Sequence, residues 1–307
     1  MRDENKALAW QSKAVLLIVV PWTVLSVVIH GYWWASHMPV VAWESLGISA
    51  VFGLAVWRMK AATPAGAATG AVITASLMFA TARFPYEWSW LHGGLMPLLA
   101  VFLLTFAATK IGRAKKERIG TAESRRGRNA VQVAANLGAA VLLSTFPFEL
   151  FTRGHISIPH LYSFAMFFST VALSEAAADT VSSEIGQVFG GEPRLITTLK
   201  KVARGTDGGI TFAGTLAGAG ASLVVMFVGI SSSRGAHSLE AWDSILIGAT
   251  GGTFGLLFDS LLGATFERRG WLNNDAVNFL STFSSWTFVM AAMVALLFVE
   301  WFPRLRF

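Results

Sequence analysis

The chain alternates between long apolar blocks and short polar segments. The blocks are each about 17–22 residues long, the length that a helix needs to cross about 30 Å of hydrocarbon. Backbone groups in lipid must be satisfied within the segment, so each block is expected to be a helix. About nine spans are predicted, at residues 14–31, 40–57, 64–82, 92–109, 129–148, 160–178, 208–230, 242–263 and 279–300. The expected fold is an all-α, polytopic membrane bundle that forms a single domain over residues 1–307.

Charge is scarce and unevenly placed. Charged residues make up 14% of the chain and hydrophobic residues 54%, whereas soluble domains usually carry about 25% charge. With the N-terminus in the cytoplasm, 19 of the 24 Lys and Arg residues fall on the cytoplasmic side, as the positive-inside rule requires. The other five are Arg83, Arg153, Arg234, Arg304 and Arg306. We therefore expect a bacterial inner-membrane protein with its active site on the cytoplasmic side. The net charge of +6 is explained by membrane topology, so no nucleic-acid partner is expected.

Polar residues inside membrane helices are costly and are candidates for function. They form four groups, and the predicted topology places all four on the cytoplasmic side. The first is Arg128, Asn129, Gln132 and Asn136, of which the three amides share one helix face. Amides and a guanidinium at a helix start suit phosphate oxygens. A simple headgroup anchor would not explain Gln132 and Asn136, which lie deeper.

The second group lies at the end of the sixth apolar block. Glu175, Asp179 and Ser183 stack four residues apart on one helix face, and Glu184 follows. Like charges at this spacing repel unless a cation lies near them, and hard oxygen ligands suit Mg²⁺. A helix end emerging into water would explain Glu184 but not Glu175.

The third group joins basic residues to a glycine-rich turn. Lys200, Lys201 and Arg204 precede the run Gly205, Thr206, Asp207, Gly208 and Gly209, which leads directly into an apolar helix. Glycines permit tight turns and close backbone approach, and free N–H groups at a helix start favour an anion. The Gly-Lys-Ser/Thr ending of a Walker loop is absent. Phosphate binding is therefore expected here, and Asp207 is a candidate metal ligand or helix cap.

The fourth group contains Asp259 inside an apolar segment, Glu267 on the same face, and Asp275 shortly after. Buried Asp259 needs a metal, a base or a bound substrate as its partner.

The residues that are missing from this side also constrain the chemistry. The predicted cytoplasmic cluster has no histidine, and the chain has no cysteine, so Ser-His-Asp hydrolysis and thiolate metal sites are not expected. Carboxylates, amides, basic residues and a glycine loop fit metal-assisted phosphoryl or nucleotidyl transfer, in which positioning and charge neutralisation dominate.

The motifs resemble a known family. They are Gly127-Arg128-Asn129-Ala-Val-Gln132, Ala178-Asp179-Thr-Val-Ser-Ser-Glu184-Ile-Gly186, the Gly205–Gly209 run and Asp259-Ser-Leu-Leu-Gly263. In this order they resemble the integral-membrane family that includes plant chloroplast phytyl-phosphate kinase. The resemblance covers residues 61–300, and residues 1–60 are less diagnostic.

The resemblance implies a kinase that converts phytyl or geranylgeranyl monophosphate into the diphosphate. The expected donor is a nucleoside triphosphate, with CTP foremost, together with Mg²⁺; the partners are the prenyl phosphate, the nucleotide and membrane lipids. Asp179, Asp207 and Asp259 are the expected catalytic residues, and Glu184 joins them as a metal ligand. The expected substrate and nucleotide contacts are Arg128, Asn129, Gln132, Asn136, Ser183, Lys200, Gly205, Thr206, Gly208, Gly209 and Asp275.

Two other functions are compatible with the sequence. A CDP-lipid synthase or prenol-kinase-like transferase would use the same cytoplasmic chemistry. A transporter would use Glu175 and Asp259 as coupling-ion sites in discontinuous helices. A carrier should expose polar residues towards both sides, whereas the outer halves of these blocks are mostly apolar and aromatic.

Overall fold

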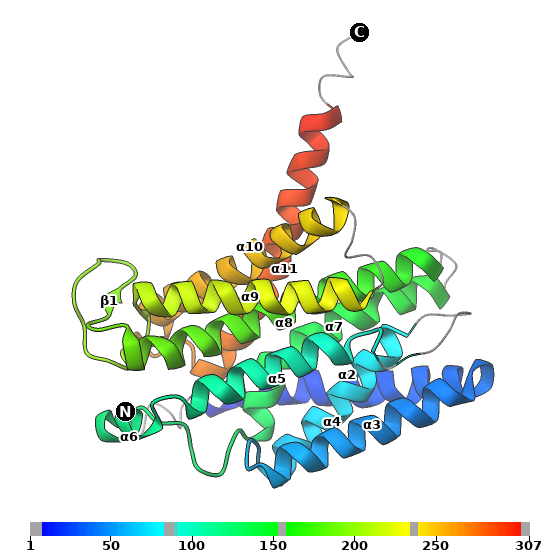
Figure 1. Ribbon diagram of the computed structural model, residues 1–307, viewed down its shortest axis with the longest axis horizontal. Coiled ribbons are helices and arrows are strands. Elements are labelled where there is room, and N and C mark those ends of the chain that lie inside the picture. The colour runs from blue at the N-terminus through cyan, green and yellow to red at the C-terminus, as the bar shows by residue number, and fades with distance from the viewer. Residues whose placement is uncertain (1–7, 83–88, 90, 153–157, 234–238, 302–307) are drawn as a thin grey trace.

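The computed structural model describes residues 8–82, 89, 91–152, 158–233 and 239–301. It is a bundle of long helices with one very short hairpin (Figure 1). The helices are α2 (Ala9–His37), α3 (Pro39–Arg58), α4 (Pro64–Ala80), α5 (Leu95–Lys110), α6 (Arg113–Ile119), α7 (Ala130–Thr152), α8 (Ile158–Phe189), α9 (Phe212–Ser232), α10 (Leu239–Leu262), the π-helical turn η1 (Gly263–Glu267) and α11 (Asn274–Trp301). Strands β1 (Arg194–Leu195) and β2 (Gly209–Ile210) pair antiparallel.

The structure confirms an all-α membrane protein, and each predicted apolar block overlaps one long helix. Within the described residues, five helices are long and apolar enough to cross a membrane, or six if α5 and α6, bent by 63°, form one broken span. The count of nine crossings and the cytoplasmic N-terminus stay predictions. The five basic residues predicted to lie outside fall beyond the described ranges.

Local sequence explains where the helices begin. At the start of α4, Thr63 accepts a hydrogen bond from the Gly66 N–H over 3.2 Å, and Pro64 occupies the first turn. Thr211 caps α9 in the same way through the Gly214 N–H, over 3.1 Å. The Thr211 cap ends the segment that carries the third polar group of the sequence.

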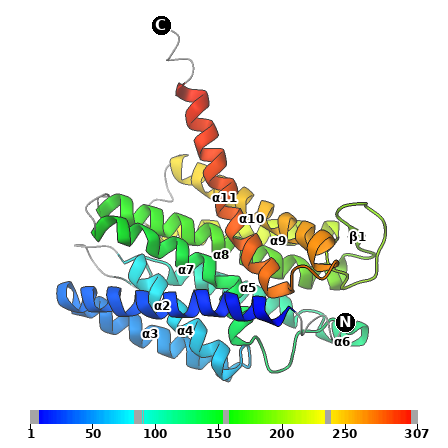
Figure 2. The same ribbon diagram turned by 180° about the vertical axis from the view of Figure 1, so that it is seen from behind.

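Helix α8 is the centre of the bundle. It contacts α5, α7, α9, α10 and α11, and its residues Leu173, Ala177 and Val181 lie in the main hydrophobic core. In Figure 2, α11 crosses in front of this layer, and its C-terminal half extends away from the other helices. A central α8 means that its polar C-terminal half meets most of the other helices.

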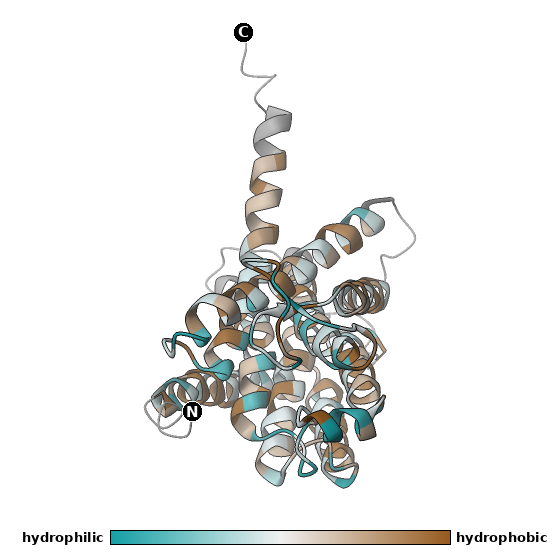
Figure 3. Cartoon of the chain, turned by 90° about the vertical axis from the view of Figure 1, so that its left-hand side faces the viewer, coloured by the Kyte–Doolittle hydropathy of each residue, from teal (hydrophilic) through white to brown (hydrophobic). Residues whose placement is uncertain are grey.

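The polar connections gather at one end of the bundle. Helix α6, the hairpin segment and the first turn of α2 lie together at that end in Figure 1, and hydrophilic residues are frequent there in Figure 3. The candidate site lies within this end.

Candidate functional site

A polar cavity of about 330 Å³ opens at this end of the bundle, a volume within the usual range for small-ligand sites. We call it the polar chamber. Its walls come from the N-terminal turns of α7, the C-terminal half of α8, the segment before α9, the end of α10 with η1, and the start of α11. Its lining includes Glu123, Arg128, Gln132, Asn136, Asp179, Thr180, Ser182, Ser183, Glu184, Gln187, Arg204, Gly205, Thr206, Asp207, Gly208, Gly209, Asp259, Ser260, Glu267, Asn274 and Asn278.

Six carboxylates line the polar chamber. Two are Glu123 and Glu184, and the other four come from three separate parts of the chain. These four are Asp179 on α8, Asp207 before α9, Asp259 on α10 and Glu267 on η1. The Oδ1 atom of Asp259 is buried and accepts no hydrogen bond from the described residues. A buried carboxylate oxygen without a donor is destabilising, so this atom is suited to a bound cation or ligand donor.

Close helix packing brings these carboxylates together. A Cβ at Gly214 would lie 2.6 Å from the Ser182 carbonyl oxygen, and one at Gly218 would lie 2.7 Å from that of Ala178, so both glycines let α9 approach α8. On α10, a Cβ at Gly252 would lie 3.2 Å from the Glu175 backbone nitrogen. The small residues therefore hold α8, α9 and α10 closely enough for Asp179 and Asp259 to line one cavity.

The glycine loop is built from two successive turns. The Thr206 N–H donates to the Ala203 carbonyl over 3.2 Å, and the Gly209 N–H donates to that of Thr206 over 2.9 Å. Gly208 has a φ of +74°, and a Cβ there would lie 2.6 Å from the Ala264 Cα atom. Both the conformation and the contact require glycine, so the loop lies directly against η1.

Asp207 is the acidic residue of this loop. Partial desolvation raises the pKa of its carboxyl, and the nearby Arg268 charge lowers it. The carboxylate is thus close to both a cation and the chamber.

The turn η1 changes which residues face the chamber. The Arg268 N–H donates to the Gly263 carbonyl over 3.2 Å, an i to i−5 bond that widens the helix. Such π-helical turns often occur at functional sites. Here the turn contributes Gly263 and Glu267 to the lining.

Arg128 is anchored through its backbone and reaches into the chamber with its side chain. Its N–H donates to the Ala61 carbonyl over 3.0 Å, and its carbonyl accepts from the Thr63 N–H over 2.9 Å. Its Nη2 donates to Thr180 Oγ1 on α8 over 3.1 Å. The guanidinium is therefore a fixed cation of the chamber and leaves most of its N–H donors available for a ligand.

A second cation, the buried Lys116, has acceptors within the protein for all three of its ammonium hydrogens. Its side chain is 1% exposed, and its Nζ donates to the carbonyls of Ala108 and Thr109 over 3.0 and 2.9 Å and to Glu184 Oε2 over 2.5 Å. Lys116 thus satisfies the C-terminal turn of α5 and neutralises Glu184. Glu184 lines the chamber as predicted, but its charge is already paired.

Comparison with known proteins decides the family. The model of the integral membrane protein family DUF92 matches residues 47–286. The chain belongs to this family. The family prediction made from the motifs is therefore confirmed.

Three relatives illustrate the spread of the DUF92 family. An uncharacterized membrane protein of Methanocaldococcus jannaschii, MJ0933, is 37% identical over 192 residues, which are 61% of this chain and 71% of that protein. The uncharacterized membrane protein sll0875 of Synechocystis is 29% identical over 257 residues, 74% of this chain and 91% of the relative. The chloroplastic protein VTE6 of Arabidopsis thaliana is 34% identical over 193 residues, 61% of this chain and 55% of VTE6. No solved structure is detectably similar.

Most residues predicted for the site of this DUF92 protein do line the chamber. They are Arg128, Gln132, Asn136, Asp179, Ser183, Glu184, Gly205, Thr206, Asp207, Gly208, Gly209 and Asp259. The lining does not include Asn129, Lys200 or Asp275.

Each of these three residues has another role or position. Asn129 and Gln132 form a reciprocal capping box at the start of α7, with N–H to side-chain oxygen distances of 2.9 and 3.0 Å. Asp275 accepts a hydrogen bond from Ser12 over 2.6 Å and thereby joins α11 to α2. The exposed Lys200 lies in the hairpin connection, where its carbonyl accepts from the Leu195 N–H over 2.9 Å.

Other chamber residues have no role in the predicted site. Glu267 and Arg204 already belong to the fourth and third polar groups of the sequence, and Glu267 shares a helix face with Asp259. Arg204 also lines the chamber, and its guanidinium donates to the carbonyls of Gly191 and Gln187 over 3.0 and 3.2 Å. It therefore holds the glycine loop against the end of α8. Glu123 lies in a basic loop, and nothing in its local sequence marks it.

The donor set is compatible with Mg²⁺ only if a substrate supplies further ligands. Within the described residues, no three His, Cys, Asp or Glu side chains are close enough to hold a metal by themselves. Mg²⁺ is usually bound through one or two carboxylates together with water and substrate phosphates. Asp179 and Asp259, with its unpartnered Oδ1, fit that arrangement.

Proposed function

We propose that this protein is a prenyl-monophosphate kinase that transfers a phosphoryl group from a nucleoside triphosphate, with CTP as the expected donor, to a phytyl or geranylgeranyl monophosphate. The observation that carries the proposal is the polar chamber itself, which combines Asp179, Asp207 and Asp259 with a glycine loop and the guanidinium of Arg128. The resemblance of the motifs to the family that includes phytyl-phosphate kinase, and the similarity to VTE6, support the same reaction.

The residues of the chamber divide between donor and acceptor. The Gly205–Gly209 backbone, which lines the chamber, holds the triphosphate, and Arg128 holds the acceptor phosphate. Asp179 and Asp259 would hold Mg²⁺ jointly with phosphate oxygens, and the ion would neutralise charge on the transferred group. Asp207 lies in the glycine loop beside the triphosphate. We leave Glu184 out of this set because Lys116 already neutralises it.

The bond changes are those of a phosphoryl transfer. An oxygen of the lipid monophosphate forms the new bond to the γ-phosphorus, and the bond from that phosphorus to the β–γ bridging oxygen breaks. The nucleoside diphosphate leaves with the electron pair. A phosphate monoester, whose second pKa is about 6, is already anionic at neutral pH, so the reaction needs no strong general base. The chamber, which contains no histidine among its lining residues, agrees with this requirement.

A carrier is the other class of function to consider. Alternating access needs a path from the binding site to both sides of the membrane. The chamber is lined by residues from one end of the bundle only. An enzyme that takes both substrates from the cytoplasm needs no second opening, so this geometry favours the transferase.

The test is a transfer assay with the purified, detergent-solubilised full chain. It supplies phytyl or geranylgeranyl monophosphate, Mg²⁺ and each γ-labelled nucleoside triphosphate, and it measures labelled lipid diphosphate. We expect product with at least one pair and loss of product in Asp179→Asn.

The matched control is Asp243→Asn, an exposed carboxylate at the opposite end of α10. It should keep wild-type activity. Product formed from α-labelled instead of γ-labelled CTP would identify a nucleotidyl transferase and contradict the kinase. Full activity of Asp179→Asn would contradict the role given to that residue.

A further inference from the structure

A second cavity lies beside the polar chamber, between α3, α4, α5 and α7. We call it the apolar groove. Its deep part is lined by Phe52, Val56, Leu98, Val101 and Phe102. The rings of Phe52 and Phe102 meet edge to face with centroids 5.5 Å apart and form part of its wall.

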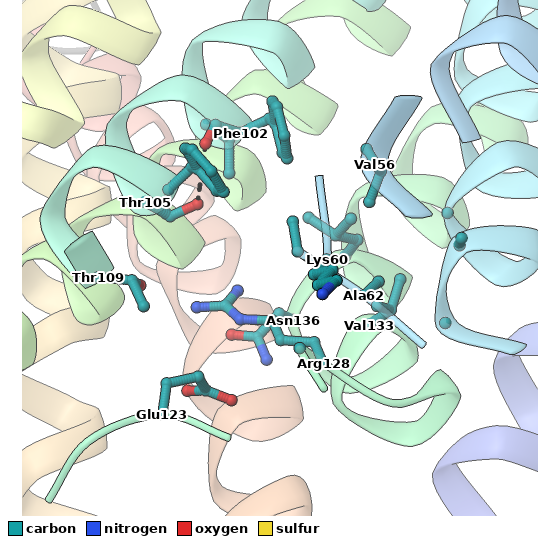
Figure 4. A pocket seen from close by; sticks show the side chains of 18 of the residues that line it. Val56, Lys60, Ala62, Phe102, Thr105, Thr109, Glu123, Arg128, Val133 and Asn136 are labelled. Carbon is teal, nitrogen blue, oxygen red and sulfur yellow. Dashed lines mark hydrogen bonds between the residues drawn. The ribbon is translucent and has the colours of Figure 1, made fainter. Parts of the chain in front are cut away.

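The apolar groove has one charged end. Lys60, Lys110, Arg113 and Arg128 line it there, with Glu123 as the acidic residue among them. Figure 4 shows Arg128, Asn136 and Glu123 at this end and Phe102 and Val56 towards the other. Its occupant should therefore have an anionic head and a hydrocarbon tail.

The groove and the chamber adjoin at this end. Both are lined by Glu123, Arg128 and Asn136. A head bound at Arg128 therefore lies at the edge of the chamber. Along α5, the groove extends from Lys110 to Leu98, about 18 Å at 1.5 Å per residue.

Lys60 provides an independent observation. It follows α3 with a φ of +55°, a conformation that glycine adopts easily and that is unfavourable for a lysine. Among the described residues no carboxylate lies within 4 Å of its ammonium, so an ion pair does not explain the lysine. Glycine is the usual residue at this position after a helix, and the lysine side chain that occurs here instead lines the charged end of the groove.

We propose that the apolar groove binds the tail of a single-chain lipid monophosphate, with the phosphate between Lys60 and Arg128. This inference rests on the proposed function for the identity of the lipid, although binding itself requires no nucleotide. The groove thereby determines which tail lengths are accepted, and Arg128 presents the phosphate to the chamber.

Gly70 gives a way to fill the groove. It lines the groove on α4, and a Cβ there would have the Val133 Cγ1 atom, at 3.9 Å, as its nearest neighbour. A larger side chain at this position thus enters the groove without an initial clash. Gly47 on α3 is exposed, and a Cβ there would meet nothing within 4 Å, so Gly47→Leu is the matched control.

The experiment measures equilibrium binding of phytyl monophosphate and of geranyl monophosphate to the purified full chain without nucleotide. Gly70→Leu should weaken binding of the long phytyl compound by roughly tenfold or more and leave the short geranyl compound within about twofold. Gly47→Leu should change neither. Equal losses for both tails, or no loss for either, would overturn the proposal.

Lys60→Gly keeps the proposal testable if Gly70→Leu does not fold. Glycine suits the backbone conformation, so thermal stability should be kept or raised while phytyl monophosphate binds roughly tenfold more weakly. Binding of phytol, which has no phosphate, should not change. Unchanged binding of the phosphate would overturn the role of Lys60.

Two further arms separate this proposal from the kinase. Tail-length-dependent binding in a protein that forms no lipid diphosphate would support the groove and reject the kinase. Kinase activity that Gly70→Leu leaves unchanged for both tails would support the kinase and reject the groove. Stronger binding of phosphatidic acid than of phytyl monophosphate, abolished by Gly70→Leu, would identify a membrane phospholipid as the occupant and overturn the proposal.

Discussion

Arg128 Nη2 donates a hydrogen bond to Thr180 Oγ1 over 3.1 Å, which joins the start of α7 to the polar half of α8. The backbone of the same arginine is bonded to Ala61 and Thr63 in the connection between α3 and α4. One residue thus links the two halves of the bundle at the boundary between the polar chamber and the apolar groove. The planar guanidinium can keep its hydrogen bond to Thr180 while its other N–H groups bind a phosphate, which a lysine ammonium does less well.

Arg128→Lys should therefore lower kcat/KM for the lipid phosphate by about 10- to 100-fold, because it loses the bidentate contact and the bond to Thr180. The fold should persist, since the anchoring bonds of Arg128 involve its backbone. Steady-state kinetics with varied lipid phosphate measure the effect. Arg126→Lys, in the exposed part of the same loop, is the control. Equal kinetics in the two variants would exclude a direct role for Arg128.

Asp259→Asn should separate activity from stability. The substitution keeps the shape of the side chain and removes a buried charge. The free energy of unfolding in detergent should therefore be unchanged or raised by about 1 kcal/mol. Turnover should fall on the order of 100-fold, because a ligand for the metal and triphosphate is lost. A variant that melts earlier and still turns over normally would show that Asp259 is structural.

Lys116 and Glu184 should behave as one structural unit. Lys116→Met leaves a buried carboxylate unpaired and should destabilise the protein by about 3–5 kcal/mol. Adding Glu184→Leu should restore part of that loss, so that the double variant is more stable than the sum of the single effects predicts. Unfolding in mixed detergent and SDS micelles measures each variant, with Arg118→Met on the exposed side of α6 as control. Strict additivity would argue against the pair.

Gly208 should be intolerant of a side chain. Gly208→Ala has to place a Cβ against Ala264 and should displace the loop, with loss of nucleotide binding. Gly191→Ala is a matched control, because Gly191 also has a positive φ, +70°, but its Cβ would meet nothing within 4 Å. It should lose about 1 kcal/mol of stability and keep nucleotide affinity. Nucleotide titration of both variants tests the difference, and identical affinities would show that the loop does not contact the donor.

The helices and most of the chamber could be predicted because they depend on patterns within single segments. Long apolar blocks specify helices, and polar residues at the ends of those blocks lie at one end of the bundle when the blocks alternate in direction. Asp179, Asp207 and Asp259 lie in one cavity for this reason.

The remaining differences arise from contacts between segments that are distant in sequence. Asp275 accepts a hydrogen bond from Ser12, which lies 263 positions earlier in the chain. Lys116 belongs to a run of basic residues that looks like a solvated loop, and only its contact with α8 shows that it is buried. Asn129 differs from these residues, because its role depends on local sequence. An Asn followed three residues later by Gln is the spacing of a capping box, so this role could have been predicted.

The division between the two cavities has a consequence for how such proteins diverge. The apolar groove is built by α3, α4, α5 and α7, whereas the acidic side of the polar chamber is built by α8, the glycine loop and α10. Only Glu123, Arg128 and Asn136 belong to both linings. Substitutions along α3 to α5 can therefore alter which lipid is accepted while the groups around the phosphates stay as they are, so paralogues with different lipid preferences can arise from a few changes in one half of the bundle.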